Sequence, residues 1–153
     1  MFADLLSPSL VLTDLEPSGK EAVLAALVGA VAPLPAVRDA DALLAAVRER
    51  EAKMTTGVGD GLALPHAHTD AVSEPVAAMA LLRRGVDFDS LDHQPVRIAV
   101  LMAGPQANRT GHVRLLSRVS RVLGQADVRR RLLAAAGAAD ALAVLADAEA
   151  ALV

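Results

Sequence analysis

The sequence predicts a single α/β domain, residues 1–153, in which helices flank both faces of a mixed β-sheet. Two observations carry this prediction. PVAAMALL (75–82) and PVRIAVLMA (95–103) are nearly continuous apolar runs bounded by glycine, proline and aspartate, a pattern typical of strands buried on both faces. Alanine- and leucine-rich tracts of helical length precede and follow these runs, and no long linker divides the chain.

The N-terminal half is expected to begin with a strand and to continue with two helices. SLVLTDL (9–15) has the composition of a short strand. A helix over 18–32 is predicted to open with a capping box between Ser18 and Glu21 and to stop at the prolines of APLP. A second helix covers about 39–51. KMTTG and GLALP then form short extended pieces around a glycine turn.

The chain is predicted to close with three helices, near 109–124, 126–136 and 138–150. The first follows the strand RIAVLMA after a short Gly-Pro loop, with Asn108 or Thr110 as its cap. Its N-terminus therefore lies at the carboxyl end of a core strand, where α/β sheets usually bind ligands, and its dipole favours an anion there.

Composition excludes several classes of protein. The chain has no cysteine, so it has no disulfide framework, thiol nucleophile or thiolate metal site. It has two phenylalanines, no tryptophan or tyrosine, and a net charge of −3, which argue against a nucleic-acid partner. The N-terminus does not resemble a signal peptide, and the longest apolar stretch (22–37) is broken by prolines. We expect a cytoplasmic protein without membrane insertion.

One face of the helix near 109–124 carries a histidine. The apolar stripe of this helix is formed by His112, Leu116, Val119 and Leu123, and a separate stripe is formed by Arg114, Arg118 and Arg121. His112 thus continues the buried face within the first turn. It is either a half-buried packing residue or part of a site at the helix start.

Arg50 ends the helix over 39–51, near the stripe of Leu43 and Val47. From the edge of the core its side chain could reach into a site. An arginine at this place more often complements the negative end of the helix dipole, so both interpretations stay open.

The stretch GVGDGLALPHAH (57–68) contains half of the histidines in the chain. Leu62 and Leu64 alternate with smaller residues as in a strand, which Pro65 is expected to end because proline has no N–H for the ladder. His66 would then be held rigidly at the strand terminus. The three glycines would let a partner surface approach, but their spacing fits neither a Walker loop nor a dinucleotide fingerprint.

Three roles are open for this histidine pair. His66 and His68 could bind a metal with Asp70 or His93, although no second firm ligand cluster supports them. The pair could belong to a purely structural turn. His66 could also be a phosphoryl nucleophile, because a neutral imidazole is available near pH 7.

Phosphoryl transfer requires an in-line nucleophile and groups that absorb charge on the phosphoryl oxygens. The chain offers the start of the helix near 109–124, His112, the hydroxyl of Thr55 or Thr56, and Arg50.

The motifs that surround these residues resemble a known family. Arg-Glu at 50–51, TTGVGDGLALPHAH, GVDFDSLDHQPVRIAVLMAGP and HVRLLSRVSRVL are similar to the fructose/mannitol-type (type 2) enzyme IIA domain of the bacterial phosphoenolpyruvate-dependent sugar phosphotransferase system and to its nitrogen-regulatory relatives. The resemblance implies that His66 carries the phosphoryl group as phosphohistidine, that His112 lies beside it, and that Arg50 belongs to the same site. His68 departs from the lysine or arginine that the family often has there.

The resemblance also implies a relay. His66 would accept phosphate from the histidine phosphocarrier protein and pass it to the IIB domain of a sugar permease, with no cofactor and no metal. The surface around it should be apolar with a polar rim. Two alternatives stay open: a nitrogen-regulatory protein that binds partners according to its phosphorylation state, and a metal-dependent hydrolase built on His66 and His68.

Overall fold

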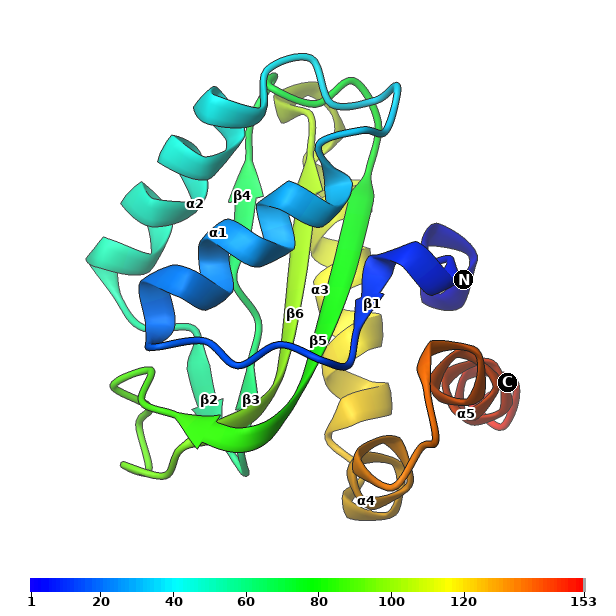
Figure 1. Ribbon diagram of the computed structural model, residues 1–153. Helices are drawn as coiled ribbons and strands as arrows, with labels where there is room; N and C mark the ends of the chain where they lie inside the picture. Colours follow the sequence, from blue (N-terminus) through cyan, green and yellow to red (C-terminus); the bar gives the residue numbers. More distant parts are fainter. Residues whose placement is uncertain (153) are drawn as a thin grey trace.

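The computed structural model describes residues 1–152 as a six-stranded sheet with helices on both faces (Figure 1). The N-terminal half contains two 3₁₀ helices at Phe2–Leu5 and Pro8–Leu10, β1 (Val11–Leu12), α1 (Lys20–Val31), α2 (Ala40–Lys53), β2 (Gly57–Gly59), β3 (Leu62–Ala63) and β4 (His66–His68). The C-terminal half contains β5 (Val76–Val86), β6 (Val96–Gly104), a 3₁₀ turn at Gln106–Asn108, α3 (Arg109–Leu123), α4 (Ala126–Leu133) and α5 (Ala138–Ala150). The predicted fold class is therefore confirmed.

The sheet is mixed, as predicted. Its order is β1-β5-β6-β3-β2, and β4 pairs with the far end of β6. The central pair β5–β6 is antiparallel, whereas β1 is parallel to β5, and both β3 and β4 are parallel to β6.

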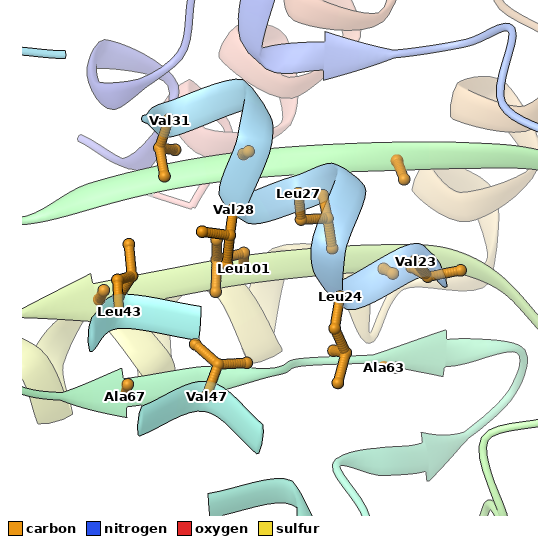
Figure 2. Close-up of a cluster of buried hydrophobic side chains, with 14 of the residues drawn as sticks. Val23, Leu24, Leu27, Val28, Val31, Leu43, Val47, Ala63, Ala67 and Leu101 are labelled. Atoms are coloured by element: carbon orange, nitrogen blue, oxygen red, sulfur yellow. The ribbon is translucent and has the colours of Figure 1, made fainter. Parts of the chain in front are cut away.

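The apolar runs of β5 and β6 are explained by burial on both faces. Along β6, Ala99, Leu101 and Ala103 pack under α1 and α2, whereas Ile98, Val100 and Met102 pack under the C-terminal helices. Figure 2 shows the first of these two cores, where side chains of α1 and α2 meet Ala63, Ala67 and Leu101 of the sheet. Each face of the sheet is thus closed by its own apolar layer.

Two predicted local features are wrong at the N-terminus. Only Val11–Leu12 of the expected strand over 9–15 pairs with β5, because Pro8–Leu10 forms a 3₁₀ turn. The capping box of α1 does not form: the N-cap is Gly19, and Glu21 pairs with Arg48 of α2 instead. The carboxylate of Glu21 is thereby used in a tertiary ion pair.

The glycines of GVGDG form a tight hairpin rather than an open approach for a partner. Asp60 and Gly61, the two central residues of the β2–β3 turn, both have positive φ (57° and 75°), as a type I′ turn requires. Gly57 packs against Ser90, whose Oγ would lie 2.2 Å from an added Cβ. The hairpin pairs with the start of β6, whereas the histidines lie along its end.

No helix within residues 1–152 is long and apolar enough to cross a membrane.

Candidate phosphoryl-transfer site

The three predicted site residues line one open cleft of about 580 Å³. His66 comes from β4, His112 from the first turns of α3, and Arg50 from the last turn of α2. His68, Lys53 and Arg109 also line the cleft, together with Ala46, Glu49, Ala67, Thr69, Gln106 and Val113. The cleft therefore lies at the carboxyl end of β6, where the sequence predicted a ligand site.

The orientation of His66 follows from strand register. Leu62 pairs with Ile98, and His66 pairs with Met102, so β3 and β4 keep one register across Pro65. The proline interrupts the ladder, but the carbonyl of Pro65 still accepts from the N–H of Met102 at 3.0 Å. β3 ends at Ala63, before Pro65, in line with the expectation that the strand does not pass through the proline, and pairing with β6 resumes at His66 as a separate strand, β4.

Alternation along this path turns both histidines toward α3. Leu62 and Leu64 contribute to the core under the C-terminal helices, and Ala63 and Ala67 to the core under α1 and α2. His66 shares the parity of Leu62 and Leu64, and so does His68. Their rings accordingly lie within 5.6 Å and 5.3 Å of the ring of His112, measured between centroids.

One backbone contact assigns the tautomer of His66. Its Nδ1 lies 2.8 Å from the carbonyl oxygen of Leu64. A carbonyl oxygen can only accept, so Nδ1 carries the proton and, in the neutral ring, Nε2 carries the free electron pair. Burial lowers the pKa of His66 below its ordinary value, more than the Leu64 bond raises it, and the positive charge of Arg50 lowers it further. His66 is therefore a neutral imidazole at pH 7.

His112 is held at the start of α3, as predicted. Asn108 caps the helix, because its side chain accepts from the N–H of Gly111 at 3.1 Å. The ring is buried on the same face as Val119 and Leu123. Burial, reinforced by the neighbouring His66 and His68, lowers the pKa of His112 to about 4. This imidazole is neutral at pH 7 and has one N–H to donate.

Arg50 serves both of the roles that the sequence left open. Its Nη1 donates to the carbonyl of Met54 at 2.9 Å, so it satisfies the end of α2. It also lines the cleft, and its charge lowers the pKa of His66. Arg50, Lys53 and Arg109 make the walls of the cleft predominantly cationic. Within residues 1–152, Glu49 is the one acidic residue that lines the cleft, and it pairs with Lys53 at 3.9 Å.

Sequence reasoning missed two basic lining residues, Lys53 and Arg109, and assigned two hydroxyls wrongly. Arg109 is the basic residue that opens α3, and this position was the available signal for it. His68, considered above as a metal ligand, also lines the cleft. The hydroxyls of Thr55 and Thr56 do not line it: Thr55 donates to the carbonyl of Phe88, and Thr56 donates to Glu51. They fix the segment between α2 and β2 instead.

The residues considered as metal ligands do not converge. Asp70 accepts from the N–H of Gln106 at 3.0 Å, and His93 lies in the loop between β5 and β6 beside Asp87 and Asp89. Within residues 1–152, no three His, Asp or Glu side chains are grouped so as to hold a metal ion. The hydrolase alternative therefore has no ligand set in this part of the chain.

The fold is that of the solved enzyme IIA domains. The solved complex of enzyme IIAMTL with phosphorylated enzyme IIBMTL from Escherichia coli matches this structure with a TM-score of 0.81 at 19% sequence identity, covering 93% of this chain and 97% of that one. At this identity the match establishes the fold.

Sequence comparison gives the family. Residues 4–148 match the model of the phosphoenolpyruvate-dependent sugar phosphotransferase system EIIA 2 family. A fructose-specific EIIA component of Haloferax volcanii is 42% identical over 119 residues, which are 78% of this chain and 77% of that protein. A nitrogen regulatory protein of Bradyrhizobium diazoefficiens is 32% identical over 143 residues, 94% of this chain and 93% of that protein. The chain belongs to this EIIA family and is a phosphoryl-carrying component of a sugar phosphotransferase system.

Proposed function

We propose that His66 accepts a phosphoryl group from the phosphohistidine of a histidine phosphocarrier protein and passes it to the IIB domain of a fructose/mannitol-type sugar transporter, in the cytoplasm. The observation that carries the proposal is the Leu64 contact, because it leaves Nε2 of His66 as the free nucleophilic nitrogen beside the cationic cleft.

Uptake from the phosphocarrier needs no group beyond two imidazoles. The Nε2 electron pair of His66 attacks phosphorus, a new P–N bond forms, and the P–N bond to the donor imidazole breaks with its electron pair returning to that ring. Phosphorylated His66 keeps its proton on Nδ1, so the ring gains positive character. The carbonyl of Leu64 faces that proton and stabilises the charged ring. Transfer to the IIB domain follows when a nucleophile of IIB bonds to phosphorus and the P–N bond to His66 breaks, returning its electron pair to Nε2.

In this proposal two side chains stabilise the phosphoryl oxygens. Arg50, which lines the cleft, would supply a permanent positive charge, and the neutral ring of His112 would donate its one N–H. The cleft also faces the N-terminal turn of α3, whose dipole favours negative charge. No cofactor is required in this scheme.

The rim of the cleft suits protein partners. Val113 lines it and is 57% exposed, and Met54, which accepts from Arg50, is 58% exposed. Apolar side chains next to charged ones are typical of a docking patch. The proposed IIB acceptor is supported by the solved enzyme IIAMTL–IIBMTL complex, in which the partner is phosphorylated.

The direct test is phosphorylation with labelled phosphoenolpyruvate, enzyme I and the phosphocarrier. Wild-type protein should gain one acid-labile, alkali-stable phosphoryl group and lose it on addition of a IIB domain. His66→Ala should gain none. His93→Asn is the matched control, because His93 lies outside the cleft and asparagine tolerates its positive φ of 61°. Label on His68 or His112 in His66→Ala would reject the assignment.

A regulatory role is the second candidate, and the similarity to the nitrogen regulatory protein favours it. The same phosphorylation at His66 would then control binding of a partner rather than feed a transporter. Affinity capture from a cell extract of the same source, with wild-type protein in both phosphorylation states, separates the two. A partner retained by one state, combined with no transfer to IIB, would select the regulatory role.

A further inference from the structure

The ring of His112 is not oriented by hydrogen bonds. Both of its nitrogens are buried, and neither has a hydrogen-bond partner within residues 1–152. The terminal torsion of a histidine side chain has broad minima, so it does not fix the ring by itself. The orientation of the His112 ring, and with it the direction of its N–H, must therefore be determined by the side chains that pack against the ring.

The packing comes from two neighbouring positions of the β4–β6 pair. His68 lies almost parallel to His112, with 5.3 Å between ring centroids and 24° between planes. His68 pairs in register with Gly104, and a Cβ added to Gly104 would lie 3.5 Å from Nδ1 of His112. Position 104 therefore lies in van der Waals range of the His112 ring, on the strand next to His68.

His66 faces the same ring in a different geometry. Its centroid is 5.6 Å from that of His112, and the planes are tilted by 47°. The His112 ring therefore contacts two histidines of β4, one stacked and one tilted. The stacked contact restrains the plane of His112 beside the reacting imidazole.

We propose that His68 is a positioning residue for phosphoryl transfer: stacking of its ring holds His112 in the orientation that serves the phosphoryl group on His66. This inference rests on the proposed function of His66. It requires a flat ring at position 68 and assigns no bond from His68 to the phosphoryl group. The effect of His68 on the rate must therefore pass through His112.

The experiment combines two substitutions at position 68 with one at 112. His68→Ala removes the stacked ring, and His68→Phe keeps a flat ring without nitrogen. Rates of transfer to the IIB domain are measured for both, for His112→Ala, and for His68→Ala/His112→Ala, with His93→Asn as control. His68→Ala should be about tenfold slower than wild type, and His68→Phe should recover most of that loss. The double variant should match His112→Ala within about twofold, since the two residues act as one unit.

A second measurement does not depend on phosphorylation. In the unphosphorylated protein, nuclear Overhauser contacts between the ring protons of His66 and His112 should be present in wild type and His68→Phe, and weakened in His68→Ala. If wild type fails to label at His66, the proposed function fails while these contacts still test the packing. The inference is overturned if the rate losses of His68→Ala and His112→Ala multiply in the double variant, or if His68→Phe is as slow as His68→Ala. Overhauser contacts that are unchanged in His68→Ala would overturn it as well.

Discussion

The ring of His112 lies 5.6 Å from the ring of His66, and its pKa is lowered to about 4. The two residues come from different elements, β4 and α3, yet both face the same side of the sheet. A buried neutral imidazole next to the reacting one is suited to donate a hydrogen bond without carrying a charge of its own.

Replacing His112 should slow transfer without preventing it. His112→Ala removes one positioned donor, and such a loss typically costs about 10²–10³-fold in rate. Rapid-quench transfer from phosphorylated protein to IIB checks this, with circular dichroism to show that the variant is folded. A rate within about twofold of wild type would mean that His112 is a packing residue of α3.

Arg50 should contribute through charge at a fixed position. Arg50→Ala is expected to accept phosphate slowly and to pass it on slowly, and Arg50→Lys to recover part of the loss because lysine keeps the charge but not the planar fork. The salt dependence of the rate should be weaker in Arg50→Ala than in wild type. Arg48→Ala, on the same helix but paired with Glu21, is the control. Equal rates for Arg50→Ala and this control would leave Arg50 only its role at the end of α2.

The lowered pKa of His112 makes stability depend on pH. Between pH 6.5 and about 4 the unfolded chain binds a proton at position 112 that the folded chain does not bind. The free energy of unfolding should therefore fall as the pH drops through this window, by on the order of 3 kcal/mol from this group alone. Urea unfolding of wild type and His112→Gln at pH 7 and 4.5 tests it. An equal pH-dependent loss in both proteins would show that His112 does not contribute.

Chelation should leave the relay intact. The transfer scheme uses two imidazoles and protein donors, and no three side chains in residues 1–152 form a metal site. Phosphorylated protein treated with a chelator and transferred into metal-free buffer should pass its phosphoryl group to IIB at the untreated rate. A large loss that zinc alone restores would return the pair of His66 and His68 to consideration as metal ligands.

Glu149 should stabilise the fold without entering the chemistry. Its fully buried carboxylate accepts from the N–H groups of Phe2 (2.9 Å) and Ala3 (2.5 Å) and from Nε of Arg118 (2.6 Å). Glu149→Ala leaves the buried N–H of Phe2 without an acceptor, whereas Arg118 is partly exposed and can be solvated, so the loss should be about 1–3 kcal/mol. Denaturant unfolding measures the loss, with the exposed Glu74→Gln as control. Stability within about 0.5 kcal/mol of wild type would show that water replaces the carboxylate.

Much of the fold is predictable because both central strands are buried. The apolar runs of β5 and β6 identify strands, but they do not tell which residue faces which helix layer, since both faces are apolar. β5 also continues beyond the predicted apolar run, through the exposed Arg83 and Arg84, to Val86. The sequence did not predict this extension because the two arginines interrupt the apolar pattern. The capping box at Ser18 failed for another reason: the ion pair of Glu21 with Arg48 joins two helices, and local sequence carries no sign of it.

The site was predicted by two different routes. The start of α3 at the end of β6 and the helical stripe of His112 follow from periodicity, and the structure brings both to the cleft. The convergence of His66, His112 and Arg50 rested on the family resemblance, because pairing of β4 with β6 is a long-range contact. The stacking of His68 could not be predicted, since it joins a residue of β4 to one of α3, and this contact depends on the pairing of β4 with β6.

Because the register with β6 is the same before and after Pro65, the number of residues between β3 and β4 determines which face of the sheet the two histidines occupy. Insertion or deletion of one residue between Gly61 and His66 would turn both rings toward α1 and α2, away from His112. A change of two residues would keep their facing and slide them along β6. Whether the number of residues in this segment is odd or even therefore decides which face of the sheet the two histidines occupy, and the length of the segment matters as much as its side chains.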